Sequence, residues 1–110
     1  MQSLTSSDEF DAVLESPLVV VYKHSSRCPI SVLAADEVAR FEEEQPEVPV
    51  YLVDVIDQRA LSRQIAARLE VVHHSPQAIV LAHGRVVWHG SHFDVRREAL
   101  AERVGTLVSD

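Results

Sequence analysis

The most informative absence in this sequence is a second cysteine, because Cys28 is the only one among 110 residues. A single cysteine excludes an internal disulfide and therefore the cross-linked framework of small secreted proteins. A lone thiol suits a reducing compartment, where it is either an inert buried residue or a reactive group. The surroundings of Cys28 must decide between these two roles.

Long apolar runs and an excess of positive charge are also missing. The longest apolar run, Leu18–Tyr22, is far shorter than the roughly 20 residues of a membrane-spanning helix. Residues 1–10 lack the basic and apolar regions of a secretory signal, so we expect a cytoplasmic protein with no membrane partner. Ten Lys and Arg against seventeen Asp and Glu give a net charge of −7, which argues against nucleic-acid binding.

The residues that are present have the composition and pattern of one α/β domain, residues 1–110. Hydrophobic residues make up 46% and charged residues 25%, as in an ordinary globular chain. Apolar spacing and turn residues predict these elements in order: a helix between Ser6 and Pro17, a strand at Leu18–Tyr22, a helix from Pro29 to about Glu44, a strand at Val50–Val55, a helix capped by Asp57, a hairpin of Ala78–Ala82 and Arg85–His89, and a helix from about Asp94 to Val108.

This α-β-α-β-α-β-β-α order predicts an α/β protein with a thioredoxin-like fold. The first two strands each precede a helix that returns the chain, so they should lie parallel. The closing hairpin adds two antiparallel strands. Because the strands are apolar on both sides, we expect a mixed four-stranded sheet with helices over both faces.

Cys28 stands where a strand ends and a helix begins, directly before Pro29, which suits the first helical position. Free backbone N–H groups and the positive end of the helix dipole favour a thiolate there. Lys23, His24 and Arg27 add positive charge within a polar loop. We therefore predict a nucleophilic Cys28, the alternative being a small buried hydrophobe.

Cys28-Pro29-Ile30-Ser31 has the spacing of a C-x-x-C redox motif with serine in the second place. In a dithiol enzyme the second cysteine attacks the mixed disulfide and releases the substrate, which serine cannot do. Ser31 either donates a hydrogen bond to the thiolate or is a neutral residue of the first helical turn. In both cases an external thiol must resolve the intermediate.

Ser75-Pro76 is the second feature of interest, since it precedes a predicted strand. Proline without fold context is cis in only about 5–6% of cases. In the thioredoxin-like fold, however, a proline at this place is often cis and presents the preceding backbone to an extended substrate beside the cysteine. We therefore predict a cis Ser75–Pro76 bond and a substrate-binding role for both residues.

The remaining polar residues give weaker signals. His89 and His92 could chelate a metal, but a site needs three or four converging ligands and Cys28 is distant in sequence, so we expect none. Asp54 is either a partly buried base or, as we favour, a cap at its strand end. Trp88 is expected to pack in the core or at the sheet edge.

The stretch Tyr22–Ser31, which contains Cys-Pro-Ile-Ser, resembles the monothiol bacilliredoxins. The similarity covers nearly the whole chain. It continues through four further stretches, which are Tyr51–Ile56, His74–Ile79, Gly84–Trp88 and Ser91–Asp94. Two residues depart from the pattern, because Arg27 stands where the family has threonine and Phe93 where it has tryptophan.

The resemblance implies that the protein removes bacillithiol, a sugar- and malate-bearing thiol, from proteins capped during oxidative stress. Cys28 would take the bacillithiol, and free bacillithiol or another low-molecular-weight thiol would then regenerate it as co-substrate, with no tightly bound cofactor. Lys23, His24 and Arg27 would attract the carboxylates of bacillithiol. Pro29 and Ser31 would support the thiol.

Two other classes of function stay open at this stage. The chain could be a thioredoxin-like binding module that docks proteins at Ser75-Pro76 without exchange. It could also be a redox sensor that dimerises through Cys28. An unreactive Cys28 with retained partner binding would indicate the first, and a covalent dimer formed under mild oxidation would indicate the second.

Overall fold

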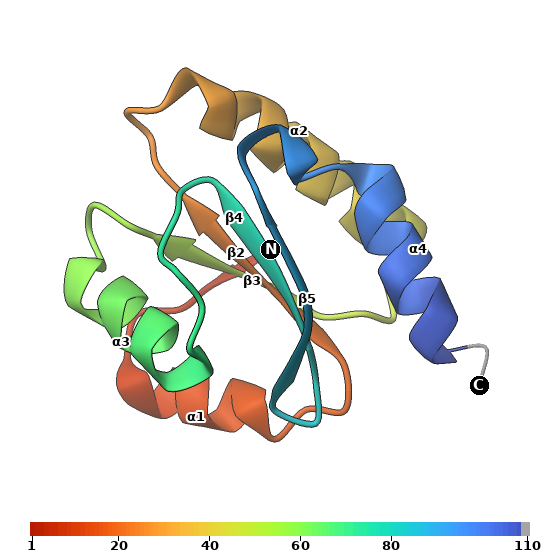
Figure 1. The fold of residues 1–110 in the computed structure, drawn as a ribbon, viewed down its shortest axis with the longest axis horizontal. Coiled ribbons are helices and arrows are strands. Elements are labelled where there is room, and N and C mark those ends of the chain that lie inside the picture. The colour runs from red at the N-terminus through yellow and green to blue at the C-terminus, as the bar shows by residue number, and fades with distance from the viewer. Residues whose placement is uncertain (109–110) are drawn as a thin grey trace.

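The computed structural model describes the backbone of residues 1–108 and the side chains of residues 1–105. Within these residues, helices and strands alternate along most of the chain (Figure 1). The elements are β1 (Gln2–Ser3), α1 (Ser7–Leu14), β2 (Val19–His24), α2 (Pro29–Glu44), β3 (Val50–Asp54), α3 (Arg59–Leu69), β4 (Gln77–Ala82), β5 (Arg85–Ser91), the short 3₁₀ helix η1 (His92–Asp94) and α4 (Arg97–Val108).

The strands form one mixed sheet in the order β1-β3-β2-β4-β5. β2 and β3 are parallel and β4 is antiparallel to β5, as the sequence predicts, and β4 also runs antiparallel to β2. The fold class is confirmed, but the sheet has a fifth strand that the sequence analysis missed. β1 is only two exposed residues long and pairs with β3 through its backbone, so it carries no side-chain pattern to recognise.

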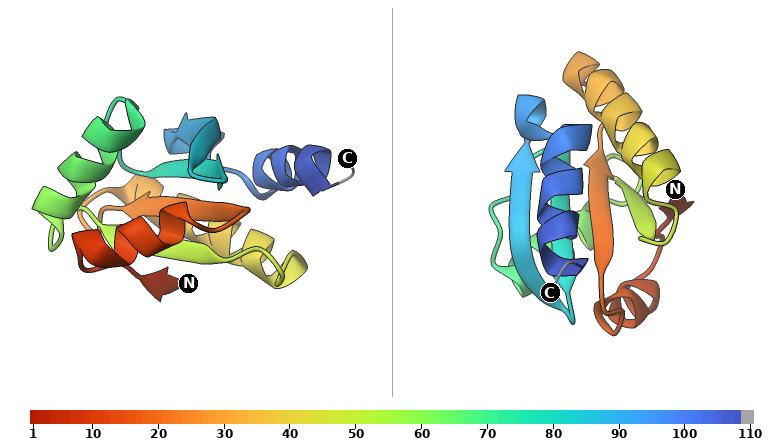
Figure 2. Two further views of the ribbon diagram at one scale, coloured as in Figure 1. Left: turned by 90° about the horizontal axis from the view of Figure 1, so that it is seen from below. Right: turned by 90° about the vertical axis from the view of Figure 1, so that its right-hand side faces the viewer.

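Two helical layers enclose the sheet, α2 and α4 on one face and α1 and α3 on the other (Figure 2). β2 shows how the sequence produces this arrangement, because its side chains alternate between the two faces. Val20 and Tyr22 pack in the core beneath α2 and α4, whereas Val19 and Val21 pack against α1 and α3. All four are fully buried, which explains why β2 is apolar on both sides.

Several element boundaries differ from the sequence expectations. Asp57 does not cap α3, whose N-cap residue is Gln58 and lacks a side-chain cap hydrogen bond. The last helix begins at Arg97 rather than near Asp94, because residues 92–94 form η1. The N–H of Arg97 instead donates to the Glu37 carboxylate at 3.0 Å, so a residue of α2 satisfies the start of α4.

The β4–β5 hairpin turns through His83 and Gly84, both with positive φ, 51° and 78°. Such angles match the twist of a two-residue hairpin. Gly84 is required for a second reason, because a Cβ there would lie 2.9 Å from the carbonyl oxygen of Leu14. The hairpin turn therefore lies against the end of α1, far along the sheet from the start of α2 (Figure 1).

Candidate active site

Cys28 is the N-cap residue of α2, and Pro29 occupies the first helical position. The Cys28 backbone is extended, with φ −106° and ψ 117°. Its N–H donates to the Ser25 carbonyl at 3.2 Å, and its own carbonyl accepts from the Ser31 N–H at 3.0 Å. Cys28 is partly exposed, so the chain delivers its thiol to a helix N-terminus with access for a substrate.

Ser31 is fully buried one turn into α2. Its Oγ accepts a hydrogen bond from the Ser25 N–H at 3.2 Å, so the hydroxyl holds the loop before Cys28 against the helix after it. Accepting this bond leaves the hydroxyl proton available for donation. Ser31 therefore has a definite structural task in the position that a resolving cysteine would occupy.

Tyr22 links the end of β2 to this helix start. Its hydroxyl donates to the Ser31 carbonyl at 3.1 Å and contacts Nδ1 of His24 at 2.9 Å. Because a phenol has one proton, His24 must donate from Nδ1, which leaves Nε2 of the neutral ring as an acceptor. Burial raises the pKa of Tyr22, and the negative charge of a Cys28 thiolate raises it further.

Lys23 is not part of a cationic loop, contrary to the sequence expectation. It lies in β2 with a fully buried side chain, on the α3 face of the sheet rather than beside the thiol. The pleat explains this placement, because Lys23 follows Val19 and Val21 at intervals of two residues. The structure therefore gives no support to Lys23 as a surface group that binds substrate carboxylates.

The Lys23 ammonium lies in a polar cluster between β2, α3 and the chain before β4. Its Nζ donates to the Ser62 carbonyl at 3.0 Å and to Nδ1 of His73 at 3.1 Å. Burial lowers the pKa of Lys23 to about 8. Burial also lowers the pKa of His73, and the charge of Lys23 adds to that effect.

Gln77 is the direct neighbour of Lys23 across the β2–β4 ladder. Its Nε2 donates to the Val72 carbonyl at 3.0 Å. Its buried Oε1 has no hydrogen-bond partner among the described residues. The α3 face at this end of β2 thus holds one buried cation and one buried free acceptor.

The Ser75–Pro76 bond is cis, which confirms the prediction. Pro76 is buried, and its carbonyl accepts a hydrogen bond from the His92 N–H at 2.9 Å. Because Lys23 pairs with Gln77, Pro76 lies beside the C-terminal end of β2, where the chain leaves toward Cys28. The register therefore brings the Ser75–Pro76 segment and the Cys28 loop to the same end of the sheet.

Of the three predicted cationic groups, Arg27 is the one that lies exposed in the loop directly before Cys28. His24 is partly exposed at the end of β2, and its ring is tied to Tyr22, with ring centroids 5.7 Å apart. The exposed charge beside the thiol is therefore smaller than the sequence suggested. The permanent positive charge there is that of Arg27.

The weaker signals have simple structural outcomes. One oxygen of Asp54 accepts from the N–H groups of Ile56 and Asp57 at 2.9 and 3.0 Å, so Asp54 caps its strand end. Trp88 packs against the core, as expected. Among the described residues, no group of three or more metal-ligating side chains converges. No helix in that part of the chain is long and apolar enough to cross a membrane.

Four residues of this region escaped the sequence analysis: Tyr22, Ser62, His73 and Gln77. Tyr22 was taken only as an apolar strand residue, although a buried tyrosine needs a partner for its hydroxyl. A stricter use of the two-residue period would have assigned Lys23 to the buried face. Its partners could not be named, because they depend on the pairing of β2 with β4 and on how α3 packs.

Thioredoxins share the architecture with little sequence identity. The chain is 16% identical to thioredoxin from Trypanosoma brucei brucei, with a TM-score of 0.82 over 98% of this chain and 90% of that one. It is 20% identical to Fasciola hepatica thioredoxin, with a TM-score of 0.78 over 96% and 98% of the two chains. These similarities confirm the thioredoxin fold.

A higher similarity is found to a solved structure described as a candidate oxidoreductase with a thioredoxin fold. Its sequence is 38% identical, and the TM-score is 0.88 over 94% of this chain and 92% of that one. The family model described as "Monothiol bacilliredoxin BrxC" matches residues 2–100. With one cysteine at the start of α2 and a serine three residues on, the chain belongs to the monothiol bacilliredoxin family and is a thiol oxidoreductase.

Proposed function

We propose that this protein removes bacillithiol from proteins whose cysteines carry it as a mixed disulfide. The feature that carries the proposal is the combination at the start of α2, a partly exposed Cys28 followed by a buried Ser31. Cys28 is the only thiol in the chain, and the Ser31 hydroxyl is engaged with the Ser25 N–H. This arrangement suits a one-cysteine transfer reaction.

The reaction has two exchange steps that conserve electrons. The Cys28 thiolate attacks the bacillithiol sulfur, a new S–S bond forms, and the target cysteine leaves as a thiolate that takes a proton. A second bacillithiol, as thiolate, then attacks the bacillithiol sulfur bound to Cys28. Cys28 is released as a thiolate, and the product is bacillithiol disulfide.

The N-terminus of α2 stabilises the Cys28 thiolate, which is the nucleophile in the first step and the leaving group in the second. Pro29 fixes the first helical position without an N–H, and the dipole of the following 16-residue helix favours negative charge on the Cys28 sulfur. The Ser31 hydroxyl and the Tyr22 hydroxyl order the loop through Ser25 and the first turn. The cis Ser75–Pro76 segment lies at the same end of the sheet as a place for substrate backbone.

The choice of bacillithiol as the capping thiol rests on family membership and on local charge. Bacillithiol carries the carboxylates of its malate group, and Arg27 is an exposed cation one residue from Cys28. Exposed pairs of this kind contribute only about 0.2–1 kcal/mol. Charge therefore adjusts the preference for an anionic thiol, whereas Cys28 performs the exchange with any accessible disulfide.

The test compares rates on one target protein that carries bacillithiol, glutathione or an uncharged thiol, at low and high salt. We expect the bacillithiol adduct to react fastest, and we expect rising salt to reduce its advantage because exposed charges are screened. Arg27→Glu should lower that advantage about two- to fivefold. Equal rates on all three adducts would contradict bacillithiol as the selected partner while leaving thiol exchange in place.

A further inference from the structure

A cavity of about 310 Å³ lies beside the start of α2, between that helix and the chain that follows β5. Ile30, Leu33 and Ala34 line it from α2, and Phe93 and Val95 line it from η1 and the residue after it. We call this cavity the α2–η1 groove. Its volume is at the lower end of the range for a side chain or small-ligand site.

Two large apolar side chains are well exposed on the walls of the α2–η1 groove. Leu33 is 61% exposed and Phe93 is 67% exposed, and they come from the two opposite walls. Large apolar side chains this exposed on both walls of one groove indicate an interaction site.

The rim of the groove is acidic. Asp36, Glu37 and Glu98 line it, against one guanidinium from Arg96. Arg40 and Arg97 partly balance Asp36 and Glu98, but the lining itself carries more carboxylates than guanidiniums, so it favours a cationic ligand over the anionic bacillithiol. An apolar segment that carries lysine or arginine complements both the floor and the rim.

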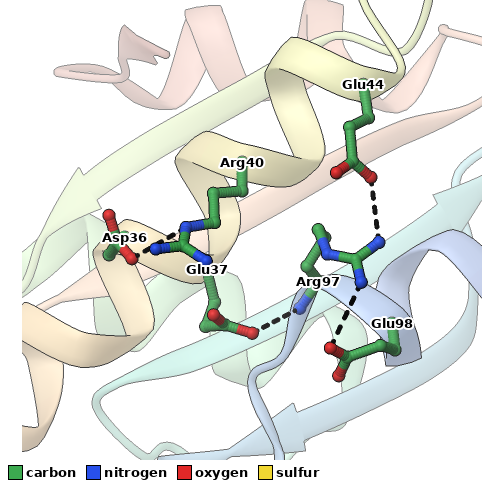
Figure 3. A network of polar contacts seen from close by, with 6 residues as sticks. All are labelled: Asp36, Glu37, Arg40, Glu44, Arg97 and Glu98. Atoms are coloured by element: carbon green, nitrogen blue, oxygen red, sulfur yellow. Dashed lines mark hydrogen bonds and ion pairs between the residues drawn. The ribbon is translucent and has the colours of Figure 1, made fainter.

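Two of the three rim carboxylates, Glu37 and Glu98, are bonded to Arg97 (Figure 3). Glu37 accepts from the Arg97 N–H at 3.0 Å, and the Arg97 guanidinium bonds Glu44 and Glu98 at 3.0 and 3.3 Å. Asp36 pairs with Arg40 at 3.1 Å, but both side chains are about 60% exposed, so this pair is weak and can exchange partners. The contact between α2 and α4 thus forms this side of the groove.

The groove also continues directly from the active site. Ile30 is part of the Cys-Pro-Ile-Ser stretch, and the backbone of His92, on the opposite wall, donates to the Pro76 carbonyl. Leu33 is five residues beyond Cys28, which is about 7.5 Å along a helix axis. An extended substrate covers that distance in two or three residues at about 3.3 Å each.

We propose that the α2–η1 groove binds the target protein itself, taking a bulky apolar side chain two or three residues from the capped cysteine, with lysine or arginine next to it. The proposal rests on the thiol exchange at Cys28 described above. It gives the site a second specificity element that is independent of the capping thiol. The capping thiol binds near Arg27, and the target segment binds to Leu33, Phe93 and the acidic rim.

The test uses peptides with one capped cysteine and, three residues on, either Leu-Lys, Ser-Lys or Leu-Glu. Each peptide is capped either with bacillithiol or with neutral 2-mercaptoethanol. We expect the Leu-Lys peptide to react roughly five- to tenfold faster in kcat/KM than the other two, mainly through KM, with both caps. Equal rates on the three peptides would overturn the proposal.

Variants locate the effect on the protein. Leu33→Ser combined with Phe93→Ser should remove the preference for the Leu-Lys peptide and leave the small disulfide of bacillithiol with cysteamine reacting at its original rate. Val87→Ser is the matched control, because Val87 is an exposed apolar residue, 42% exposed, in β5 and outside the groove. It should change nothing. Asp36→Asn should reduce the preference for lysine about twofold.

Three results would overturn the inference. An equal loss on the cysteamine disulfide would show that the groove residues act on the capping thiol or on the chemistry. The same loss in Val87→Ser would show a general effect of surface change. If the wild type sediments as a dimer and Leu33→Ser as a monomer, the occupant of the groove is a second copy of this chain. If bacillithiol and 2-mercaptoethanol caps react equally but the peptide order persists, the groove stands and the bacillithiol assignment fails.

Discussion

The two faces of β2 carry different polar groups at the same end of the strand. On the α2 face, Tyr22 and His24 bond to each other, and the Tyr22 hydroxyl also donates to Ser31 in the first turn of α2, directly after Cys28. On the α3 face, Lys23 is fully buried and bonds to Ser62 and His73. Residues adjacent in sequence therefore serve different layers, and Cys28 belongs to the layer of α2, whose N-cap it is.

The comparison is between a charged group, the Lys23 ammonium on the α3 face, and a neutral one, the Tyr22 hydroxyl on the face of Cys28. A buried ammonium loses its hydration and recovers part of that energy from its hydrogen-bond partners. The Tyr22 hydroxyl is also buried, but it is neutral and costs less to desolvate. We therefore expect changes on the α3 face to affect stability first, and changes on the α2 face to affect the thiol.

The largest effect is expected where the α2 face ends, at Cys28. Cys28→Ser should abolish exchange and mixed-disulfide formation, because the chain has no other thiol. Rates on a bacillithiol-capped target measure this directly. Ser31→Cys provides the opposite change, since a second sulfur would release the bound thiol internally. Exchange that survives in Cys28→Ser would contradict the mechanism.

The next largest effect concerns the α3 face. Lys23→Ala should lower the free energy of unfolding by about 2–4 kcal/mol, because it empties buried volume and removes the donor to Ser62 and His73. Lys23→Met keeps the volume without the charge and should change stability by less than about 1.5 kcal/mol. Denaturant unfolding measures both variants. Equal losses in the two would show that the ammonium itself is needed.

The pH dependence of stability should have opposite signs on the two faces. Burial lowers the pKa of Lys23 from 10.5 to about 8, so between these values the unfolded chain binds more protons and stability rises with pH. From pH 8 to pH 10 the rise should approach about 2 kcal/mol. The raised pKa of Tyr22 acts only above its ordinary value of 10.0, where the folded state keeps the proton and stability falls.

Unfolding at several pH values, on the wild type and on single variants, tests this contrast. Lys23→Met should lose the rise between pH 8 and 10. Tyr22→Phe should keep that rise and lose the decline above pH 10. A wild-type curve that is flat from pH 8 to 10 would mean that Lys23 stays charged in the folded protein.

The smallest effect is expected for the Tyr22 hydroxyl. Tyr22→Phe keeps the buried ring and removes the donor to the Ser31 carbonyl, so stability should fall by about 1 kcal/mol. Exchange should slow by less than tenfold, since Ser31 still holds Ser25. Ser16→Ala is a control for loss of a hydroxyl elsewhere, because Ser16 is a half-buried residue before the opposite end of β2. An unchanged stability and rate would show that the Tyr22–Ser31 contact does not order the loop.

The sequence was sufficient for the features that depend on local patterns. The order of the four α-helices and of strands β2–β5, the placement of Cys28 before Pro29 and the cis Ser75–Pro76 bond were predicted correctly. Each depends on apolar periodicity or on a motif of this fold. Whether Ser31 donates to the thiolate stays open, as it was from the sequence, although its hydroxyl does bond the Ser25 N–H.

The features that were missed depend on pairing and packing. Whether Lys23 is a loop residue or a strand residue is decided by its partner Gln77 on β4, which is distant in sequence. β1 exists because the edge of β3 offers free backbone groups, and its own two residues carry no pattern. The α2–η1 groove was invisible for the same reason, since Leu33 and Phe93 come from separate elements.

The central claim is that Cys28 takes the capping thiol and releases the target. Intact-mass spectrometry tests it on the protein mixed with a bacillithiol-capped target, with no free thiol added and samples quenched by acid. The account predicts one bacillithiol on the protein at Cys28, appearing at the rate at which uncapped target forms. A disulfide between Cys28 and the target, with free bacillithiol released, would contradict it.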